Sequence, residues 1–339
     1  MGFKIRVEPS GHSFECDEEE TVLDGALRAG VMLPYGCRDG LCGACRGRVV
    51  TGVVDQSSVT TAALGMAERE QGTALFCCAK PRSDLTIRAR EAGSSAVIPV
   101  RTLPVRVERL ERVAPDVMLI ELKLPGSEKF EYLAGQYVEI LLPGGKRRAF
   151  SLASVPGEGS LQLHVRHVRG GSFTGHVFDG MKVRDLLRIN GPHGSFFLRE
   201  DSDKPMLLIA KGTGFAPIKA VVERAIACGL SRPMHIYWGG KRRSDLYLSD
   251  LAAGWAQSHS HIRFVPVLSD ADAEDRWDGR TGLAHLAAME DFPDLTGYQA
   301  YVCGSPAMVA AARRDLVGRG ALPEDEFIAD SFEFSRDPV

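Results

Sequence analysis

The sequence lacks several features that would place the chain in other classes of protein. None of its apolar runs reaches the ~18–20 residues that a membrane-spanning helix needs. The formal net charge is −3, so there is no basic surplus of the kind that nucleic-acid binding requires. The N-terminal segment has no secretory apolar core. With 44% hydrophobic and 25% charged residues the composition is typical of a globular protein, and we expect a cytoplasmic location.

The chain of 339 residues is long enough for two or three domains, and it contains no internal repeat. The segment 91–104 carries small residues and two prolines, a composition typical of a linker. We therefore expect a first domain over residues 1–92, a linker over 93–101, a second domain over 102–200 and a third over 204–330.

The first segment opens with a pattern typical of a β-hairpin, in which residues 4–7 and 12–17 alternate between apolar and polar side chains. A short helix is expected around 21–29, because Thr21 is a favourable N-cap and Gly30 a favourable residue to follow the last turn.

The second segment is rich in strand patterns. Period-2 alternation or continuous β-rich runs occur over 105–110, 117–124, 137–142 and 161–166. Turn residues separate some of these runs. The pattern predicts an antiparallel β-barrel or sandwich.

The third segment alternates strands with helices. Apolar strands are predicted over 206–210, 235–238, 262–268 and 300–304. The helix expected after the first strand carries Phe215, Ile218, Val221, Val222 and Ile226 on one side. Such alternation predicts an α/β doubly wound parallel sheet.

Five of the eight cysteines fall between Cys37 and Cys78. In a reducing compartment they are thiols or metal ligands before they are disulfides. Cys37, Cys42 and Cys45 form a C-x4-C-x2-C pattern, and Cys77 follows at a distance, which is the plant-type 2Fe-2S spacing. Four cysteines can also hold a structural zinc ion, although zinc sites usually show two C-x2-C pairs and this cluster has one.

The residues around these cysteines fit an anionic cluster. The small residues of the loop let the backbone aim N–H groups at the sulfurs; they are Gly36, Gly40, Gly43 and Ala44. The loop arginines are candidates to offset the negative charge; they are Arg38, Arg46 and Arg48. Cys77 and Cys78 are adjacent, and only one of them can ligate comfortably, because neighbouring side chains of a strand face opposite ways.

The loop over residues 34–52, together with 75–81, resembles the plant-type ferredoxin domain over about residues 1–90. The resemblance implies an α+β fold of the β-grasp kind for this domain. It also makes Cys77 the fourth metal ligand, with Cys78 where a glutamine often stands.

In the second segment, Arg148-Ala149-Phe150-Ser151 resembles the R-x-Y/F-S motif of the ferredoxin–NADP reductase family. In such a motif Arg148 can neutralise a pyrophosphate, Phe150 can stack on an isoalloxazine ring, and Ser151 can hydrogen-bond flavin N5.

Two further motifs follow in the order that the same family has. Gly171-Ser172-Phe173-Thr174 resembles its G-x-x-S/T turn, where the backbone and the hydroxyl groups of Ser172 and Thr174 bind the pyrophosphate. Residues 191–198 resemble the segment that closes the flavin domain. The motifs together predict a flavin, and the resemblance favours FAD over FMN.

In the third segment, a strand is followed by Gly212-Thr213-Gly214 and then a helix, whose N-terminus can bind a phosphate. This resembles the family's G-G-T-G-x-x-P motif, except that Lys211 stands where glycine is usual. The sequence leaves open whether Lys211 contacts phosphate or points to solvent.

Residues 238–248 follow the second strand of this segment, where the adenosine ribose is expected. Lys241, Arg242 and Arg243 can pair the 2′-phosphate of NADPH, or they can form a solvated charged run. Related reductases of this domain order mostly use NADH, so the resemblance favours NADH.

Two motifs near the C-terminus resemble the reacting end of the same family. Cys303-Gly304 begins a Cys-Gly-x-Pro turn that lies beside the nicotinamide, so Cys303 is expected next to the hydride path. Phe332, with Phe334 second, matches the aromatic residue that covers the flavin; the alternative is a core residue of a final strand.

The domain order resembles that of reductase components of bacterial oxygenases, such as the benzoate and terephthalate dioxygenase systems, and of CDP-6-deoxy-glucoseen reductases. The resemblance implies an enzyme that passes electrons from NADH through FAD and the 2Fe-2S cluster to a protein acceptor. That acceptor is an oxygenase component, or alternatively a deoxysugar dehydrase. No side-chain acid or base is needed for the electron steps.

Overall fold

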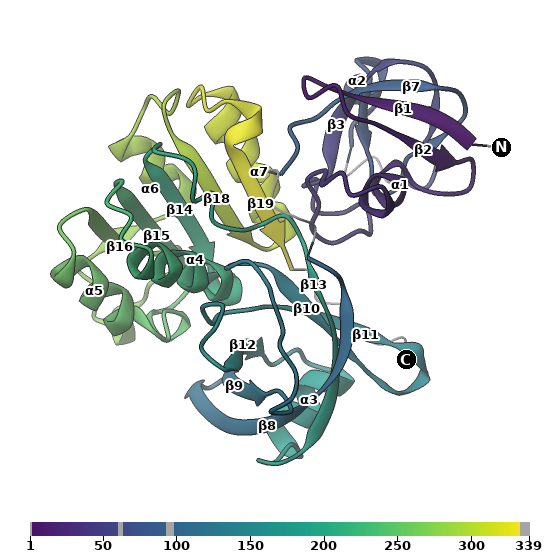
Figure 1. The fold of residues 1–339 in the computed structure, drawn as a ribbon. Helices are drawn as coiled ribbons and strands as arrows, with labels where there is room; N and C mark the ends of the chain where they lie inside the picture. The colour runs from purple at the N-terminus through teal and green to yellow at the C-terminus, as the bar shows by residue number, and fades with distance from the viewer. Residues whose placement is uncertain (1, 60–63, 93–97, 333–339) are drawn as a thin grey trace. The chain divides into compact units, whose positions relative to one another are not determined.

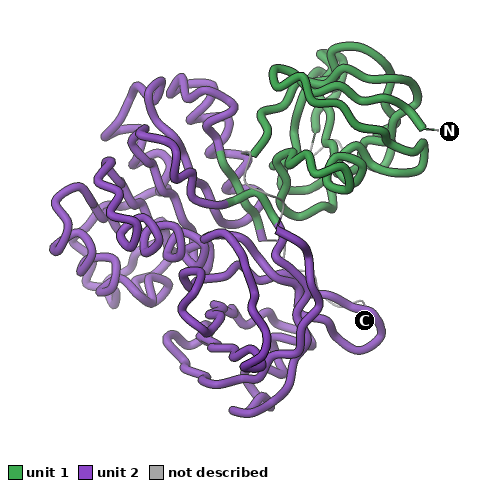
Figure 2. The backbone as a smooth tube through the Cα atoms, in the orientation of Figure 1, with its two compact units in different colours: residues 1–97, 194–196, 328–331 green, residues 98–193, 197–327, 332–339 purple. Residues whose placement is uncertain are grey.

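The computed structural model describes residues 2–59, 64–92 and 98–332. Contacts divide the chain into two compact units, each described by itself (Figure 2). The first unit comprises residues 1–97 with two short later segments, 194–196 and 328–331, and the second comprises the rest. Most of the predicted linker, residues 93–97, lies outside the described residues.

The first unit is built on a five-stranded sheet in the order β2-β1-β7-β3-β5 (Figure 1). Its strands are β1 (Gly2–Glu8), β2 (Ser13–Asp17), β3 (Arg46–Thr51), β5 (Thr73–Leu75) and β7 (Leu85–Arg88), and β4 (Val54–Asp55) pairs with β6 (Lys80–Pro81). The predicted hairpin is confirmed, since β1 and β2 pair antiparallel. Because β7 pairs parallel with β1 and antiparallel with β3, the sheet is mixed, as an α+β fold requires.

The predicted helix forms as α1 (Val22–Arg28), and a second short helix is α2 (Met66–Glu70). The Thr21 hydroxyl accepts a hydrogen bond from the Asp24 N–H at 3.1 Å and so caps α1. Leu23 of α1 is fully buried in one apolar core with Ile5 and Ile87 of the sheet. Burial of each such side chain stabilises the fold by roughly 1.5–3 kcal/mol.

Residues 194–196 belong to the first unit through hydrogen bonds to Tyr35. The Tyr35 N–H donates to Ser195 Oγ at 2.8 Å, and the Ser195 N–H donates to the Tyr35 carbonyl at 2.9 Å. Both residues are buried. The backbone of Tyr35, two residues before Cys37, is therefore held by a part of the chain far away in sequence.

The second unit contains a six-stranded antiparallel sheet in the order β11-β10-β13-β8-β9-β12. Its strands are β8 (Arg101–Ala114), β9 (Val117–Lys123), β10 (Tyr137–Leu141), β11 (Arg147–Ser151), β12 (Ser160–Arg166) and β13 (Leu186–His193). An antiparallel bridge between Leu152, just after β11, and Leu163 of β12 closes the sheet. The four predicted strands are confirmed, and the fold is the barrel and not the sandwich.

A second six-stranded sheet has the order β17-β16-β15-β14-β18-β19, and all of it except residues 328–331 of β19 belongs to this unit. Its strands are β14 (Met206–Lys211), β15 (Met234–Gly240), β16 (Ile262–Leu268), β17 (Arg280–Thr281), β18 (Gln299–Gly304) and β19 (Phe327–Ser331). The helices between them are α4 (Phe215–Ala227), α5 (Ser249–Ser258), α6 (Ala284–Asp291) and α7 (Pro306–Gly318). Strands β14, β15, β16 and β18 pair parallel, which confirms the predicted doubly wound sheet.

The order of this sheet reverses at β14. From β14 the chain moves outward through β15 to β16, and it then returns to place β18 on the other side of β14. In open α/β sheets, ligands bind outside the carboxyl ends of the strands at such a switch point. A ligand-binding site is therefore expected among the residues that follow β14 and β18.

Candidate cofactor and electron-transfer sites

The first candidate site is the cysteine loop between α1 and β3. Cys42, Cys45 and Cys77 are buried, and Cys37 is half-buried. No disulfide joins them. All of the predicted metal ligands therefore lie together in the first unit as free thiols.

Backbone N–H groups surround the first two sulfurs. The Asp39 and Cys42 N–H groups donate to Cys37 Sγ, and the Cys37 and Ala44 N–H groups donate to Cys42 Sγ, each at 3.4 Å. The hydrogen bond between the two thiols, together with these donors, lowers the pKa of Cys37 to about 6. The same hydrogen bond, with burial, raises the pKa of Cys42, so the loop favours thiolate, the form that binds metal, at Cys37.

The four sulfurs form two pairs. Hydrogen bonding links Cys37 with Cys42, and Cys45 Sγ lies 3.1 Å from Cys77 Sγ. Two pairs suit a two-iron cluster, in which each iron takes two thiolates, whereas zinc needs all four around one point. The pairing of the four sulfurs therefore fits the 2Fe-2S cluster.

Cys78 lies beside this cluster of thiols but in a different environment. Its Sγ is 3.6 Å from Cys77 Sγ, and a Cβ built on Gly40 would lie only 2.7 Å from it. Glycine at position 40, whose φ is 72°, is needed there to leave room for the Cys78 sulfur. Cys78 thus packs against the loop backbone, while Cys77 faces Cys45.

Two of the loop arginines have carboxylate partners. Arg38 is paired with Asp24 and Arg46 with Glu68. Their charges are therefore partly balanced by carboxylates of α1 and α2, while backbone N–H groups of the loop are aimed directly at sulfur.

The predicted flavin motif lies in β11. Arg148 and Phe150 are half-buried and alternate with the exposed Arg147 and Ala149, so they share one face of the strand. The ring of Phe150 lies 5.4 Å from that of Phe173, measured between centroids. An arginine and an aromatic ring on one face provide a cation for a phosphate and a surface for a flat ring system.

Ser151 ends this strand and is buried, at 3% exposed. Its backbone pairs with Tyr137 of β10. The hydroxyl is therefore fixed inside the barrel edge and not in a mobile loop, which suits a group that must meet a single flavin atom.

The predicted pyrophosphate turn leads into α3 (Ser172–Asp179), with Gly171 at its N-cap and Ser172 exposed. The Thr174 hydroxyl accepts a hydrogen bond from the Val168 N–H at 3.1 Å and lies within hydrogen-bonding distance of two carbonyl oxygens. Thr174 therefore holds the turn in shape, and the exposed N-terminus of α3 is the part of the motif that faces outward.

The predicted dinucleotide turn lies at the switch point. Gly212-Thr213-Gly214 joins β14 to α4, and a Cβ built on Gly214 would lie 2.3 Å from the carbonyl oxygen of Cys303. No side chain fits there. The turns after β14 and β18 therefore pack directly on each other, which brings the two predicted nicotinamide motifs together.

A cavity of about 210 Å³ opens at the carboxyl ends of these strands. Its lining includes Lys211, Gly239, Gly240, Ser269, Leu283 and Met308. The lining is mainly apolar, and the Lys211 side chain has no ion pair among the described residues. Lys211 is half-buried and belongs to this lining, and its contact with a phosphate stays a prediction.

Phe332 lies next to the Cys303–Gly304 turn, because its N–H donates to the Gly304 carbonyl at 2.9 Å. It is half-buried and directly follows β19, so it is not a core residue of that strand. Phe334, the second candidate, lies outside the described residues.

Arg166 and Asp245 belong to this region although no sequence motif indicated them. Arg166, at the end of β12, pairs with Asp116 at 2.8 Å and with Asp245 at 3.2 Å. Its Nη2 is buried without a hydrogen-bond partner and lies 3.2 Å from the Cβ position of Gly212. In the sequence, Arg166 is only a charged residue at the end of a strand with alternating polarity, and a charged side chain in such a position is usually solvated.

His164 of the same strand is buried, and its Nδ1 lies 2.9 Å from the Tyr247 hydroxyl. Burial, with a contribution from Lys219, lowers the pKa of His164 to about 3. The imidazole is therefore neutral at physiological pH and acts as a packing and hydrogen-bonding group.

Comparison with known proteins assigns a domain to each region. Residues 5–82 match the 2Fe-2S iron-sulfur cluster binding domain, 104–198 the oxidoreductase FAD-binding domain and 208–314 the oxidoreductase NAD-binding domain. Over 333 residues the chain is 40% identical to CDP-6-deoxy-L-threo-D-glycero-4-hexulose-3-dehydrase reductase of Yersinia pseudotuberculosis, covering 98% of this chain and 99% of that one. The chain belongs to the iron–sulfur flavoprotein reductases.

Two further similarities span the whole reductase. Terephthalate 1,2-dioxygenase reductase component 2 of Comamonas is 33% identical over 337 residues, 98% of each chain. The crystal structure of Amycolatopsis cytochrome P450 reductase GcoB is 36% identical with a TM-score of 0.73, covering 97% of this chain and 98% of that one. The predicted resemblance and the predicted cofactors, a 2Fe-2S cluster, FAD and a nicotinamide nucleotide, are confirmed.

Among the residues described, no helix of the reductase has the length and apolar character to cross a membrane.

Proposed function

We propose that this reductase takes hydride from NADH and delivers electrons singly to the oxygenase component of a multicomponent oxygenase, in the cytoplasm. The observation that carries this proposal is the presence of all three cofactor modules in one chain, in an order shared over its full length with the Comamonas and Amycolatopsis reductases. Those two relatives are named for a dioxygenase and a cytochrome P450, which are both oxygenases.

Each group of residues then has a proposed task. FAD, when bound, would accept one hydride, which carries two electrons, and release these electrons one at a time to the 2Fe-2S cluster, which carries one. Arg148, Ala149, Phe150 and Ser151 hold and orient the flavin, with Gly171 and Ser172 at its pyrophosphate and Thr174 holding that turn in shape. Gly212, Thr213 and Gly214 bind the nicotinamide nucleotide. Cys303, Gly304 and Phe332 border the hydride path and exclude water from it.

In this scheme the cluster ligands are Cys37, Cys42, Cys45 and Cys77. The domain bounds proposed with it are residues 1–92, 102–200 and 204–330, joined by 93–101.

A second acceptor is favoured by one specific observation. The Yersinia relative, at 40% identity, is named for a CDP-6-deoxyhexulose dehydrase. A dehydrase of that kind is therefore the alternative partner.

A reconstitution experiment distinguishes the oxygenase from the dehydrase as the electron acceptor. The purified reductase is mixed with NADH and either an aromatic-ring dioxygenase component or a CDP-6-deoxyhexulose 3-dehydrase, each with its substrate. We expect substrate-dependent NADH oxidation and product only with the oxygenase. Product formation with the dehydrase alone would replace the first partner by the second, and failure of NADH to bleach the flavin would remove both.

Replacing Arg148 tests the flavin assignment. Loss of a charged hydrogen-bonding group costs about 1.5–3 kcal/mol, so Arg148→Ala should weaken FAD binding by roughly 10–100-fold. The matched control is Arg147→Ala, since Arg147 faces the other side of β11 and pairs with Glu139. FAD content after dialysis measures the effect, and a mutant that keeps full flavin would remove the assignment.

Replacing Lys211 tests whether its side chain contacts a phosphate of the nucleotide bound in the cavity. Lys211→Gln should raise the KM for NADH about tenfold and leave kcat unchanged, because a contact made equally before and during hydride transfer affects binding alone. Lys182→Gln, an exposed lysine of the barrel, is the control. An unchanged KM in Lys211→Gln would contradict a phosphate contact.

A further inference from the structure

The loop that follows β15 lies at one end of the nucleotide cavity. Gly239 and Gly240 of β15 and Ser269 after β16 line the cavity, and the loop 241–245 continues directly from them. In doubly wound folds, the residues after this strand meet the adenosine ribose and its 2′ substituent. The charges of this loop therefore decide which nucleotide is accepted.

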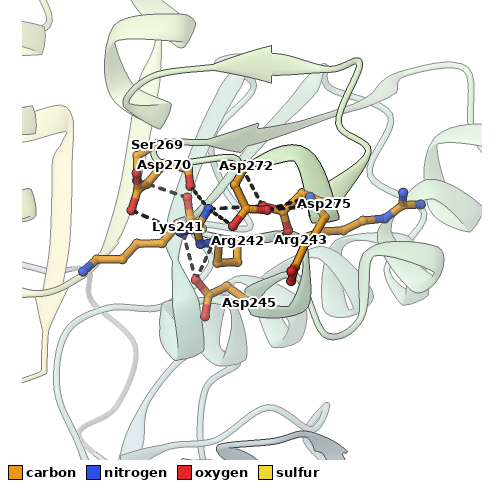
Figure 3. Close-up of polar contacts among 10 residues, drawn as sticks. Lys241, Arg242, Arg243, Asp245, Ser269, Asp270, Asp272 and Asp275 are labelled. Atoms are coloured by element: carbon orange, nitrogen blue, oxygen red, sulfur yellow. Dashed lines mark hydrogen bonds and ion pairs between the residues drawn. The ribbon is translucent and has the colours of Figure 1, made fainter.

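Arg242, the predicted partner for a 2′-phosphate, is surrounded by carboxylates (Figure 3). Its Nη1 lies 2.7 Å from Asp272 Oδ2 and 3.6 Å from Asp275 Oδ2, and donates to the Asp270 carbonyl at 2.5 Å. Its Nη2 lies 3.8 Å from Asp270 Oδ2. The guanidinium is thus directed toward the loop 269–275.

Backbone hydrogen bonds hold two of these carboxylates, those of Asp272 and Asp275, whereas the Asp270 side chain is 70% exposed. Asp275 Oδ1 accepts from the Arg243 N–H at 2.8 Å, and Asp272 Oδ1 accepts from the Glu274 N–H at 2.9 Å. The backbone donors of Arg243 and Asp272, with Arg242, lower the pKa of Asp275, so it is ionised at neutral pH. At Asp272 and Asp275 the arginine therefore meets carboxylates that the loop backbone already holds.

Asp245 adds a fourth carboxylate, and its Cβ lies 2.8 Å from the Cβ position of Gly240, a residue of the cavity lining. It accepts the Lys241 N–H at 2.8 Å and the Arg242 N–H at 3.2 Å, and these donors with Arg166 outweigh its burial and lower its pKa. The loops 241–245 and 269–275 therefore place four carboxylates around the Arg242 side chain and the backbone N–H groups of residues 241–243, while the side chains of Lys241 and Arg243 are directed away from them (Figure 3). A carboxylate accepts a ribose hydroxyl but repels a 2′-phosphate.

We propose that the carboxylates of Asp270 and Asp272, held against Arg242, make this reductase select NADH over NADPH. The inference rests on the proposed function and assigns the specificity of its nucleotide site. Arg242 has the charge that a 2′-phosphate needs, but the acidic loop already neutralises it. NADPH would have to compete with two carboxylates for one guanidinium, whereas NADH brings no such group.

The test is the double variant Asp270→Asn/Asp272→Asn. Asparagine at 272 retains an Oδ1 acceptor for the loop and removes only the charge. We expect kcat/KM for NADPH to rise about tenfold or more, while kcat/KM for NADH changes less than about threefold. The control is Glu274→Gln, which removes a charge from the same loop but none that is ion-paired with Arg242 in the described structure.

A binding readout independent of turnover uses adenosine 2′,5′-bisphosphate as a competitor of NADH. Its inhibition constant should fall about tenfold in the double variant and return to the wild-type value when Arg242→Gln is added. Wild-type preference for NADPH, or a double variant with unchanged inhibition by the bisphosphate, would overturn the proposal. Failure of both nucleotides to reduce the flavin would instead defeat the proposed function, so the two failures are distinguishable.

Discussion

A Cys42→Ser variant should lose its iron while its flavin is still reduced by NADH. Cys42 Sγ is buried, accepts two backbone N–H groups and pairs with Cys37, so a serine there removes one of the two thiolates of one iron. Even changes to groups behind the ligands cost roughly 10–100-fold in metal affinity, and loss of a ligand should cost at least that. Iron analysis and the electron paramagnetic resonance signal of the reduced protein measure the loss.

The electron steps should separate in this variant. NADH should bleach the flavin at close to the wild-type rate in stopped-flow, while cytochrome c reduction falls with the iron content. Because metal binding contributes to folding, thermal unfolding of the first unit should also shift downward. If correctly folded Cys42→Ser protein no longer accepts hydride, the modular scheme is wrong.

Two further cysteine variants are matched controls. Cys228→Ser changes an exposed thiol in the nucleotide domain and should behave as wild type. Cys78→Ser should keep its iron, because the Cys78 sulfur packs against Gly40 while Cys77 faces Cys45. If Cys77→Ser kept its full iron content and Cys78→Ser lost iron, Cys78 and not Cys77 would be the fourth ligand.

Gly214→Ala should reduce kcat/KM for NADH about a hundredfold. The new methyl group would meet the Cys303 carbonyl oxygen at 2.3 Å, so either the turn after β14 or the turn after β18 must shift. A misplacement of about 1 Å near reacting groups can cost 10²-fold in rate. Steady-state kinetics with NADH measure the effect, and FAD content should not change.

The matched control for this substitution is Gly254→Ala. Gly254 lies within α5 of the same domain, and a Cβ there meets nothing within 4 Å. Alanine in a helix interior is favoured over glycine by roughly 1 kcal/mol, so the variant should be fully active and slightly more stable. Equal activity of the two variants would show that the contact with Cys303 does not matter.

The sequence predicted those strands whose pattern of apolar residues matches the faces that they bury in the sheet. The runs at 117–124 and 206–210 form β9 and β14. They could be predicted because a strand that is buried in a sheet has a recognisable run of apolar residues. β13 was not predicted: Gly191 and Pro192 interrupt it, and Leu186 is 75% exposed. Its place in the barrel comes from pairing with β8 and β10, which no local signal records.

The candidate sites also combine local motifs, which the sequence shows, with contacts between distant residues, which it does not show. The cysteine spacing and the motifs at Arg148 and Gly212 are local, so the sequence contained them. The pairing of Arg166 with Asp245 and of Arg242 with Asp272 joins residues 30 to 79 positions apart. Charge partners at such separations depend on the finished fold, and composition alone left Arg242 as either a phosphate ligand or a solvated side chain.

The hydrogen bonds between Tyr35 and Ser195 have a consequence for engineering. A recombinant ferredoxin cut at residue 92 would lack Ser195 and leave the N–H and carbonyl of Tyr35 without these partners just before the first iron ligand. An orphaned buried polar group costs about 1–3 kcal/mol. Chimaeras that transplant this domain between reductases must therefore carry a compatible segment from around residue 195, or the grafted cluster will sit on a loosened backbone.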